Sequence, residues 1–560
     1  MLLKAKAPKK RFQRKGRQAT ESDLKAVSDY LKDETPQRDR LIEYLHRIQD
    51  DRGYLDSGIL TALAELLKLS SGEVYEVASF YHHFDIVKDD DTPPPALTVR
   101  VCDSISCNMA GAEKLINELQ AGLGDGVRLQ RVPCVGRCET APVAVVGTKP
   151  IPFAIAGRIY STIDQGNHND QIPADAESYA RYVKSGGYQR LKSIVAADDE
   201  ATREAIIKTL ESANLRGLGG AGFPAGRKWR IVRGYAAPRL MAVNIDEGEP
   251  GTFKDRYYLE RSPHRFLEGM LIAANVVGIE KIYIYLRDEY AGIRALLQRE
   301  LDTLKENPPC PLPEIELRRG AGAYICGEES AMIESIEGKR GIPRLRPPYI
   351  AEQGLFGRPT LEHNMETLYW VCELLERGAD WFSQQGRNGR HGLRSFSVSG
   401  RVKRPGMYLA PAGITLRELI DEYCEGMQEG HTLKAYFPGG ASGGILPASL
   451  SDIPLDFDTL NAYGCFIGSA AIIVLSDQDS VRQQALNAMQ FFAHESCGQC
   501  TPCRVGTQKA ATLMNELNWD QGLLEELCQV MGDASICGLG QAAPNPLRCA
   551  MKYFPEEFAQ

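Results

Sequence analysis

The chain lacks a long uninterrupted apolar run. Its most apolar region, FLEGMLIAANVVGIEKIYIYL, is broken by Glu268, Glu280 and Lys281, so it predicts a buried helix followed by a strand and not a membrane span. The first residues, MLLKAKAPKKRFQRKGRQ, never build the apolar core of a signal peptide. We therefore expect a cytoplasmic protein without membrane association.

Sequence signatures of hydrolases are also missing. The chain has no G-x-S-x-G, no H-E-x-x-H and no Walker lysine motif. His82, His83 and His494 lack companions at metal-ligand spacing, and we expect them to be structural. These absences argue against a hydrolase.

Length and charge set further limits. A chain of 560 residues with 43% apolar and 25% charged residues predicts several globular domains. The net charge of −8 argues against nucleic acid as the main ligand. Residues 1–20 form a basic arm, for which we expect a solvated tail, with docking to a partner as the alternative.

Periodicity predicts a multidomain α/β protein. Helical spacing fills 21–92, a small α/β domain spans 97–165, and a polar connecting segment covers 166–200. Helices and strands alternate over 201–385, where strands 239–245, 281–287 and 314–319 predict a parallel sheet. A compact α+β domain follows at 393–478, and helices return at 479–560.

Fifteen cysteines are many for a reducing compartment, where clustered cysteines more often bind metal than form disulfides. Eight of them are clustered. We expect the seven scattered ones to be small buried hydrophobic residues; they are Cys310, Cys326, Cys372, Cys424, Cys465, Cys528 and Cys549.

The C-terminal cysteine cluster is the most specific motif. Cys497, Cys500 and Cys503 form C-x2-C-x2-C in ESCGQCTPCR, and Cys537 follows 34 residues after the third. Three closely spaced thiolates and one remote thiolate are typical of a [4Fe–4S] cluster. Zinc bound by four thiolates, or an unliganded set, are the alternatives.

The second cluster pairs Cys102 with Cys107 and Cys134 with Cys138. Each pair follows a predicted strand of the small α/β domain, so two loops can converge on one centre. Four thiolates in two pairs predict a [2Fe–2S] cluster, with zinc as the alternative. A thioredoxin-type dithiol would need C-x-x-C, which this domain lacks.

The loop RGLGGAGFPAGRKW contains G-x-G-x-x-G at Gly217, Gly219 and Gly222. A Rossmann loop of this pattern follows a strand, whereas a helical pattern precedes this one. The loop therefore fails the test for an ordinary dinucleotide site, although its glycines permit close approach of a ligand.

Two acidic loops follow predicted strands. NIDEGEPGTFKD and GAGAYICGEES place carboxylates and glycines at the carboxyl edge of the sheet, where nucleotides bind in α/β proteins. Their acids can accept hydrogen bonds from ribose or ribityl hydroxyls. Candidate donors to a phosphate are Arg216, Lys228, Lys254, Arg340 and Arg346.

These motifs, together with RGAGAYICGEESAMIESIEGKRGIPRLRPPY, resemble the NADH-binding flavoprotein subunit of respiratory complex I over about 200–555. Residues 21–165 are similar to the thioredoxin-like [2Fe–2S] subunit of the same enzyme. The stretches FPGGASGGILPAS and SGRVKRPGMYLAPAGITLRELIDEYC, with both cysteine sets intact, look most like the fused β subunit of molybdenum- or tungsten-dependent formate dehydrogenases.

The resemblance implies a fold and two sets of contacts. It implies a thioredoxin-like ferredoxin domain, a Rossmann-like flavin domain, a ubiquitin-like β-grasp domain at 393–478 and a helical [4Fe–4S] domain. The implied FMN contacts are Gly217, Gly219, Gly220, Lys228, Asn244, Asp246, Glu247, Tyr324, Gly327, Glu328 and Asn364. The implied NAD contacts are Phe223, Glu249, Glu329, Arg346 and Tyr349.

The resemblance also implies a function and a partner. FMN carries the hydride chemistry, so no side chain is expected to act as acid or nucleophile. Electrons pass between FMN and the [4Fe–4S] cluster, with the [2Fe–2S] cluster as a reservoir. The expected partner is a catalytic subunit with a molybdenum or tungsten pterin and further clusters. Glu249 and Glu329 would repel a 2′-phosphate, which favours NAD.

Two other interpretations remain open at this point. One is the NAD-linked subunit of a hydrogenase or of complex I, which shares the same cofactors. The other is a zinc-stabilised scaffold that binds nucleotides without electron transfer. Visible absorption separates the scaffold from both redox proteins, because zinc sites are colourless.

Overall fold

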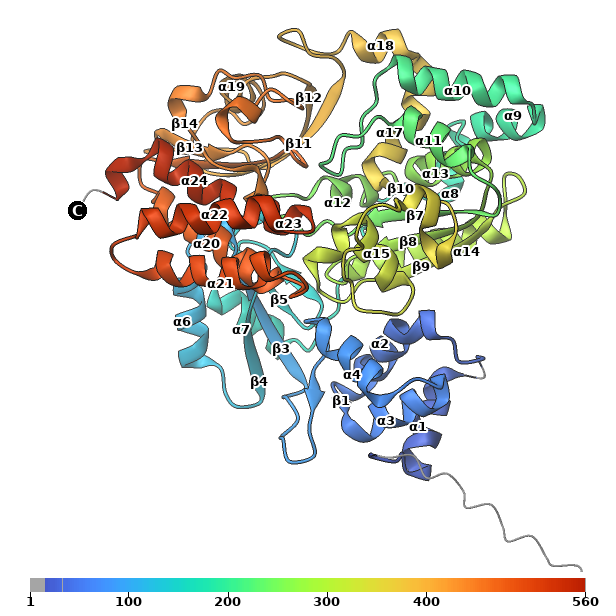
Figure 1. The fold of residues 1–560 in the computed structure, drawn as a ribbon, viewed down its shortest axis with the longest axis horizontal. Coiled ribbons are helices and arrows are strands. Elements are labelled where there is room, and N and C mark those ends of the chain that lie inside the picture. The colour runs from blue at the N-terminus through green and yellow to red at the C-terminus, as the bar shows by residue number, and fades with distance from the viewer. Residues whose placement is uncertain (1–15, 33, 559–560) are drawn as a thin grey trace, which may run out of the picture. The chain divides into compact units, whose positions relative to one another are not determined.

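The computed structural model describes residues 16–32 and 34–558, so most of the predicted basic arm lies outside the described residues. The chain divides into two compact units, Met1–Pro94 and Pro95–Gln560 (Figure 1). Among the described residues, none of the helices combines the length and apolar character that a bilayer crossing needs.

The first unit is helical, as predicted for this segment. Its helices are α1 (Glu21–Leu31), α2 (Leu41–Arg52), α3 (Ser57–Leu67) and α4 (Ser71–Phe80), and the short strands β1 (Leu55–Asp56) and β2 (Ile86–Val87) pair in parallel. Capping boxes at Thr20 and Ser70 begin α1 and α4 by satisfying free backbone amides. Leu45 and Leu63 are among the fully buried residues of this core.

The second unit begins with a small sheet domain. Its strand order is β4-β3-β5-β6, where β3 (Leu97–Cys102) and β4 (Val127–Val132) are parallel and β5 (Ala144–Val146) and β6 (Lys149–Ile151) are antiparallel. The helices are α5 (Ile105–Met109), α6 (Ala112–Gly122) and α7 (Ala156–Asp164). Cys102 is the last residue of β3, so it lies at the carboxyl end of this inner strand.

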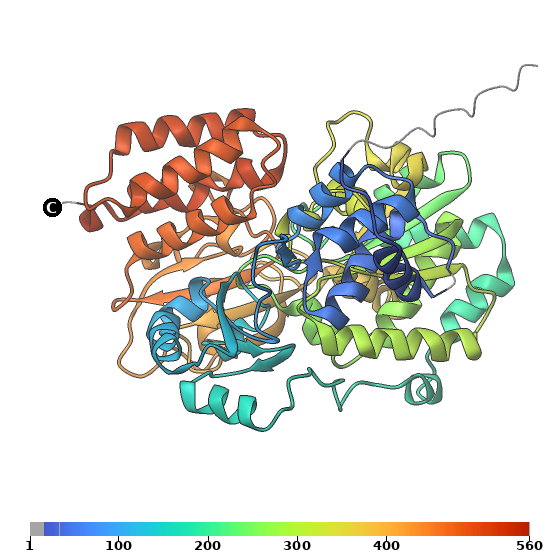
Figure 2. The same cartoon turned by 90° about the horizontal axis from the view of Figure 1, so that it is seen from below.

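The segment after α7 carries helices that the sequence pattern did not predict. It runs as an extended stretch toward α8 (Tyr179–Lys184), as Figure 2 shows, and then forms α9 (Gln189–Ala197). Leu191 and Ile194 of α9 pack into the core of the next domain. Residues 188–197 therefore belong structurally to that domain, because Tyr188, Leu191 and Ile194 anchor this segment in its core while the rest of α9 stays largely exposed.

The parallel-sheet domain positions the glycine and acidic loops. Its strand order is β10-β7-β8-β9, all parallel, with β7 (Arg239–Ile245), β8 (Ile279–Leu286), β9 (Glu314–Arg319) and β10 (Thr360–Asn364). Three of these strands match the prediction, and β10 was not predicted. The remaining helices are α10 (Glu200–Ser212), α11 (Ala225–Arg233), α12 (Lys254–Leu259), α13 (Pro263–Val277), α14 (Ala291–Glu306), α15 (Glu329–Ile336), α16 (Ile350–Gln353), α17 (Met365–Arg377) and α18 (Ala379–Ser383).

A mixed-sheet domain follows. Its order is β12-β11-β15-β13-β14, built from β11 (Leu393–Gly400), β12 (Gly406–Pro411), β13 (Leu433–Phe437), β14 (Leu446–Pro447) and β15 (Ala471–Ser476), with helix α19 (Leu416–Tyr423). All six residues of β15 are buried, as expected for a central strand. The predicted α+β character is confirmed.

The chain ends in a helical domain of α20 (Val481–Glu495), α21 (Thr501–Asn515), α22 (Gln521–Ala534), α23 (Gly538–Ala542) and α24 (Pro544–Tyr553). In Figure 1 these helices lie beside the mixed sheet, and α24 contacts β14. Pro502 and Pro544 stand in the first turns of α21 and α24, where a missing amide hydrogen costs nothing.

Candidate functional site

A cavity of about 360 Å³ opens where the parallel-sheet, mixed-sheet and C-terminal helical domains meet. Its walls come from the glycine loop, from the acidic loop 246–253, from the turn 324–328, and from segments of the two other domains. The lining residues outside the parallel-sheet domain are Ser442, Phe466, Gly468, Ser469, Gly538, Leu539 and Ala542.

The cavity collects most of the residues predicted to contact FMN. Nine of the eleven line it: Gly219, Gly220, Asn244, Asp246, Glu247, Tyr324, Gly327, Glu328 and Asn364. Gly217 and Lys228 do not. Gly217 instead donates its amide hydrogen to the carbonyl of Phe223, and Lys228 donates to the carbonyl and carboxylate oxygens of Glu362.

The residues predicted to contact NAD divide into two groups. Glu249 lines the cavity itself. Phe223, Arg346 and Tyr349 keep considerable exposure outside the cavity lining, and Arg346 pairs with Glu328 and with Glu329, the latter at 2.8 Å. Because Glu328 also lines the cavity, its ion pair joins the exposed residue Arg346 to the cavity wall.

Asp246 presents an unsatisfied acceptor inside the cavity. Its Oδ2 atom is buried and has no hydrogen-bond partner in the part of the chain that the structure describes. Burial raises the pKa of this carboxyl well above its usual range, although Arg287 opposes the shift. A buried acceptor without a donor fits a ligand that carries hydroxyl groups, such as the ribityl chain of FMN.

Glu247 is buried but its carboxylate is fully engaged. Oε1 accepts from the amide of Asp255 at 2.7 Å, and Oε2 accepts from the amide of Arg256 at 3.2 Å and from the hydroxyl of Tyr290 at 2.8 Å. Burial, with Asp255 adding to it, raises the pKa of Glu247 to about 7, while Lys254 opposes the shift. The side chain thus fixes the path of the acidic loop into α12.

Glu249 ties the acidic loop to the mixed-sheet domain. Its Oε1 accepts from the amide and hydroxyl of Ser442, at 2.7 and 2.8 Å, and its Oε2 accepts from the hydroxyl of Tyr324. Burial raises the pKa of this carboxyl, and the hydrogen bonds from Tyr324 and Ser442 oppose that rise. The contacts that the carboxylate makes here are with the protein.

Lys254 lines the cavity as a buried cation. Its Nζ lies 2.8 Å from Asp255 and 3.0 Å from Glu366, and it donates to Asn364 at 3.3 Å. Burial alone would lower the pKa of this lysine, but the neighbouring carboxylates outweigh that effect and raise it. Lys254 is therefore charged, and of the five predicted phosphate donors it is the one that lines the cavity.

Sequence reasoning missed the part of the wall that comes from distant domains. Gly468 and Ser469 lie against Gly220, and the hydroxyls of Ser469 and Thr252 are 2.6 Å apart. One part of the cavity lining is polar. It contains Thr252, Lys254, Gly468 and Ser469. The glycine-rich run 439–444, which contributes Ser442, was an available signal, but its place beside the parallel-sheet domain depends on the tertiary fold.

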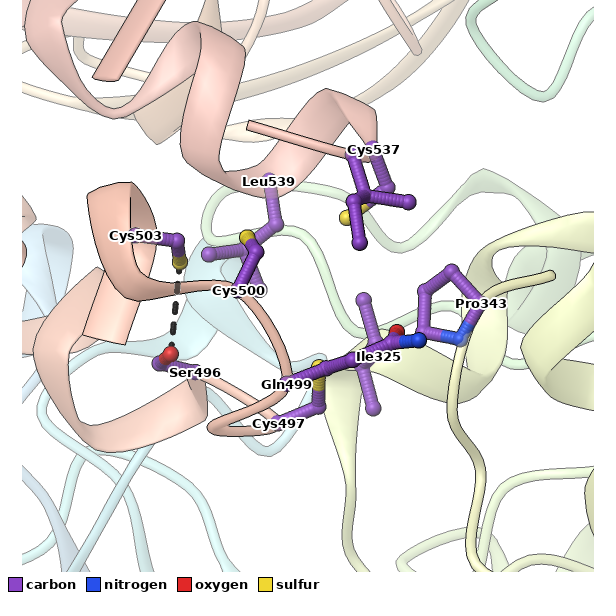
Figure 3. Close-up of a pocket in the computed structure, with 10 residues that line it drawn as sticks. Ile325, Pro343, Ser496, Cys497, Gln499, Cys500, Cys503, Cys537 and Leu539 are labelled. Atoms are coloured by element: carbon purple, nitrogen blue, oxygen red, sulfur yellow. Dashed lines mark hydrogen bonds between the residues drawn. The ribbon is translucent and has the colours of Figure 1, made fainter. Parts of the chain in front are cut away.

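A second, small cavity gathers the four C-terminal cysteines. Cys497, Cys500, Cys503 and Cys537 all line it, and Figure 3 shows their side chains entering a common space. Cys500 and Cys537 stand at the N-caps of α21 and α23. Four converging thiols fit a tetrahedral sulfur-rich metal centre.

The protein surroundings alone disfavour thiolates in this cavity. Burial raises the pKa of Cys503 to about 11 and that of Cys537 to about 12. The Cys503 sulfur also lies 3.2 Å from the hydroxyl of Ser496, drawn as the dashed line in Figure 3. Because a metal centre binds thiolates and repels their protons, such a set is expected to require the metal for deprotonation.

Two apolar side chains separate the small cavity from the large one. Ile325 and Leu539 line both, so the cysteine centre and the large cavity share a wall one side chain thick. Ile325 comes from the turn between β9 and α15, and Leu539 comes from α23. The shared wall places two candidate redox sites next to each other.

The cysteines of the small sheet domain also converge, and all four are buried. The sulfur atoms of Cys134 and Cys138 are 3.2 Å apart, and the Cys102 thiol interacts with those of Cys107 and Cys134. The loop between Cys134 and Cys138 turns at Gly136, whose φ is +69°. A Cβ there would lie 2.1 Å from the Tyr290 hydroxyl, so only glycine fits.

Arg287 connects this second cysteine centre to the acidic loop. Its buried guanidinium donates to the carbonyl of Cys134 at 2.7 Å and to the carbonyl of Glu247. Glu289 binds the same guanidinium at 2.8 and 3.0 Å. Arg256 adds a parallel link by donating to the carbonyl of Gly136 at 2.9 Å. The second cysteine centre is thus tied to the acidic loop, whereas the first shares Ile325 and Leu539 with the large cavity.

Comparisons with protein-family models match four segments of the chain. Residues 27–165 match the thioredoxin-like [2Fe-2S] ferredoxin, 210–373 the Nuo51 FMN-binding domain, 395–446 the SLBB domain, and 483–560 the iron-sulfur binding region of NADH-ubiquinone oxidoreductase-F. The matches confirm the predicted fold class and the predicted FMN, [2Fe–2S] and [4Fe–4S] cofactors.

Whole-protein comparisons find similar chains. The F 2 subunit of NADH-quinone oxidoreductase from Rhizobium meliloti is 39% identical over 405 residues, which cover 70% of this chain and 95% of that protein. The F subunit of the enzyme from Aquifex aeolicus is 39% identical over 395 residues, covering 68% and 90%. A solved chain of an NAD⁺-reducing [NiFe]-hydrogenase in the H₂-reduced state superposes with a TM-score of 0.80 at 32% identity, covering 93% and 92%.

The raised pKa of Glu247 predicts a pH-dependent stability. Its pKa is about 7 in the folded chain against 4.5 when unperturbed, so between these values the folded state holds an extra proton. The free energy of unfolding therefore falls as the pH rises from about 4.5 to about 7, and Glu247 causes no further change above that range. We expect the melting temperature of the wild-type apoprotein, relative to Glu247→Gln, to decrease from about pH 5 to pH 7. Parallel melting profiles for the two proteins would contradict the raised pKa.

Proposed function

This chain belongs to the family of NADH-quinone oxidoreductase F subunits, and on that premise we propose that it is the NAD-linked electron-transfer subunit of a cytoplasmic formate-oxidising complex. Family membership makes it a subunit of an NAD-dependent oxidoreductase with FMN and two iron–sulfur regions. The formate-oxidising partner goes beyond family membership and is our own proposal.

The shared wall of Ile325 and Leu539 is the observation on which electron transfer rests. It separates the FMN cavity from the four C-terminal cysteines by single apolar side chains. When bound, FMN exchanges a hydride with nicotinamide and the iron–sulfur clusters take up electrons singly. Both side chains of the wall are apolar, so neither offers a group that could carry a proton between the two centres.

We assign the FMN site to the large cavity. Asp246 supplies a buried acceptor for a hydroxyl group, and Asn244 and Asn364 at the ends of β7 and β10 add amide groups beside it. Lys254 supplies the positive charge for the phosphate end. Gly219 and Gly220 leave the cavity floor without side chains, which permits a flat ring to approach the backbone.

We assign the nicotinamide nucleotide to the exposed side of this cavity. Phe223 and Tyr349 present exposed rings to a nucleotide base, and Arg346 can pair with its phosphates once its contacts with Glu328 and Glu329 rearrange. Glu329 and Glu249 carry the negative charge that disfavours a 2′-phosphate. This arrangement favours NAD over NADP.

We assign the cluster ligands residue by residue. Cys497, Cys500, Cys503 and Cys537 hold [4Fe–4S], and Cys102, Cys107, Cys134 and Cys138 hold [2Fe–2S]. Each set is complete and convergent. Zinc is disfavoured because the matched family regions are iron–sulfur regions.

The formate-oxidising partner is supported by the sequence. The intact N-terminal cysteine set and the stretches 399–424 and 437–449 resemble the β subunit of formate dehydrogenases. In this arrangement the partner carries the molybdenum or tungsten pterin and further clusters, and electrons enter this chain at the [4Fe–4S] side. The [2Fe–2S] centre lies off that path, behind the acidic loop.

An NAD⁺-reducing hydrogenase is the second candidate, favoured by the superposition over 93% of the chain. Native purification separates the two candidates. We expect a large subunit containing molybdenum or tungsten and formate-dependent reduction of NAD⁺. A nickel-containing subunit with hydrogen-dependent reduction would replace the proposal with the hydrogenase alternative.

The position of the C-terminal cysteines predicts the effect of Cys500→Ala. The substitution removes one ligand of the cluster that links FMN to the partner, but it leaves the walls of the FMN cavity unchanged. We expect NADH to bleach the flavin anaerobically at the wild-type rate, while electron exchange with the partner falls to background.

The control is Cys528→Ala, which removes a buried thiol of α22 in the same domain. Cys528→Ala should preserve both the reduction of the flavin by NADH and the electron exchange with the partner. If NADH no longer bleached the flavin in a folded, flavin-replete Cys500→Ala protein, the proposed order of the two centres would be wrong.

The contact between Arg287 and Cys134 predicts control of the [2Fe–2S] potential. A buried cation next to the cluster loop stabilises the reduced, more negative cluster. We expect Arg287→Gln to lower the midpoint potential by about 60 mV or more, which corresponds to a tenfold change in a one-electron equilibrium. Electron paramagnetic resonance during a redox titration measures the shift.

Arg318→Gln provides the matched control, because Arg318 is equally buried on β9 but pairs with Glu316. It should leave the potential unchanged. An unaltered [2Fe–2S] potential in Arg287→Gln, with the full iron content, would refute the assigned role.

A further inference from the structure

Two cysteines outside both ligand sets meet at the junction of the mixed-sheet and C-terminal helical domains. Cys465 follows a turn of the mixed-sheet domain, and Cys549 lies on α24. Their sulfur atoms are 3.5 Å apart although the residues are 84 positions apart in sequence. Both side chains are buried, at 2% and 3% exposure.

The backbone around the pair leaves room for the two sulfur atoms. Gly444 has a φ of +83°, and a Cβ at this position would lie 2.6 Å from the Cys465 sulfur and 3.1 Å from the Cys549 sulfur. Any larger residue would therefore push the thiols aside. Glycine at 444 keeps them in direct contact.

Hydrogen bonds on either side hold the two segments in register. The Tyr553 hydroxyl donates to the carbonyl of Tyr463 at 2.9 Å, and the Asn545 side chain donates to the carbonyl of Ser442 at 3.0 Å. These bonds flank Cys549 along α24. The thiols thus face each other across a junction that is fixed independently of them.

The surroundings activate one of the two thiols. The contact with the Cys465 sulfur lowers the pKa of Cys549, burial opposes this, and Lys552 one turn away lowers it further. The same pairing raises the pKa of Cys465. Lys552, one turn along α24, favours the thiolate at Cys549, and the 3.5 Å contact places Cys465 to react second.

We propose that Cys465 and Cys549 form a reversible disulfide when the protein meets hydrogen peroxide. The Cys549 thiolate attacks one peroxide oxygen, so an S–O bond forms, the O–O bond breaks and the departing hydroxide takes up a proton as water. The Cys465 sulfur then attacks the sulfenic sulfur, an S–S bond forms, and a second water leaves. Two thiols lose two electrons and two protons to one peroxide.

The disulfide would close a loop around the iron–sulfur segment. Cys497, Cys500, Cys503 and Cys537 all lie between the two ends, so the bond fastens both ends of the segment that carries the C-terminal ligands. A clamp of this kind preserves the fold of the segment when an oxidant removes the cluster. Reassembly then starts from a folded domain.

Peptide mapping of the full chain tests the proposal. Anaerobically purified protein is treated with a small excess of hydrogen peroxide, denatured, alkylated and digested. We expect a linked peptide pair containing Cys465 and Cys549, lighter by two hydrogens than the free peptides and separated by dithiothreitol. Recovery of both thiols in alkylated form, or of either linked to another cysteine, would overturn the proposal.

Variants and hydrogen exchange extend the test. Cys465→Ser and Cys549→Ser should abolish the linked peptide, whereas Cys528→Ser should retain it. Amide hydrogen exchange of α24 should be slower by about tenfold or more in the oxidised wild type than in the reduced wild type, because closing a long loop restricts the unfolded state. If α24 exchanged at the same rate in oxidised wild type and in oxidised Cys465→Ser, no clamp would have formed. This holds even if the two serine variants are less stable than the wild type.

Discussion

The acidic loop 246–253 is the element on which the rest of the site depends. Its carboxylates are fully or partly buried, and two of them are bound in different directions: Glu247 toward α12 and Tyr290, Glu249 toward Ser442 of the mixed-sheet domain. Burying unpaired charge is costly, so these contacts hold the surrounding domains in one arrangement. Asp246 is the exception: its Oδ2 atom has no hydrogen-bond partner among the described residues, and the residue lines the cavity.

Much of the fold follows from local pattern. The strands 239–245 and 314–319 were predictable because short stretches with apolar and β-branched residues stand between predicted helices. Strand β10 was not, because the short segment 360–364 carries polar residues that are buried only through pairing with β7. Helix α9 was hidden for a similar reason, since Leu191 and Ile194 gain their partners from another part of the chain.

The candidate site was predictable to a different extent at each centre. Cysteine spacing identified both thiol sets, because metal ligands must come from adjacent turns or loops. The acidic and glycine loops were found from their place after strands. Ser469 and Leu539 could not be found, since they reach the cavity from domains whose docking is decided by side-chain complementarity over hundreds of residues. Arg287, which contacts the loop of the second cysteine centre, lies in no recognisable motif.

The composite cavity has a consequence for how the protein is made. Its wall runs from Gly219 to Ala542, so a nascent chain that ends before α23 lacks part of it. A nascent chain can fold its parallel sheet early, but the pocket closes only after α23 leaves the ribosome and docks. Flavin insertion is therefore a late maturation step, and truncation near the C-terminus would yield a folded but colourless sheet domain.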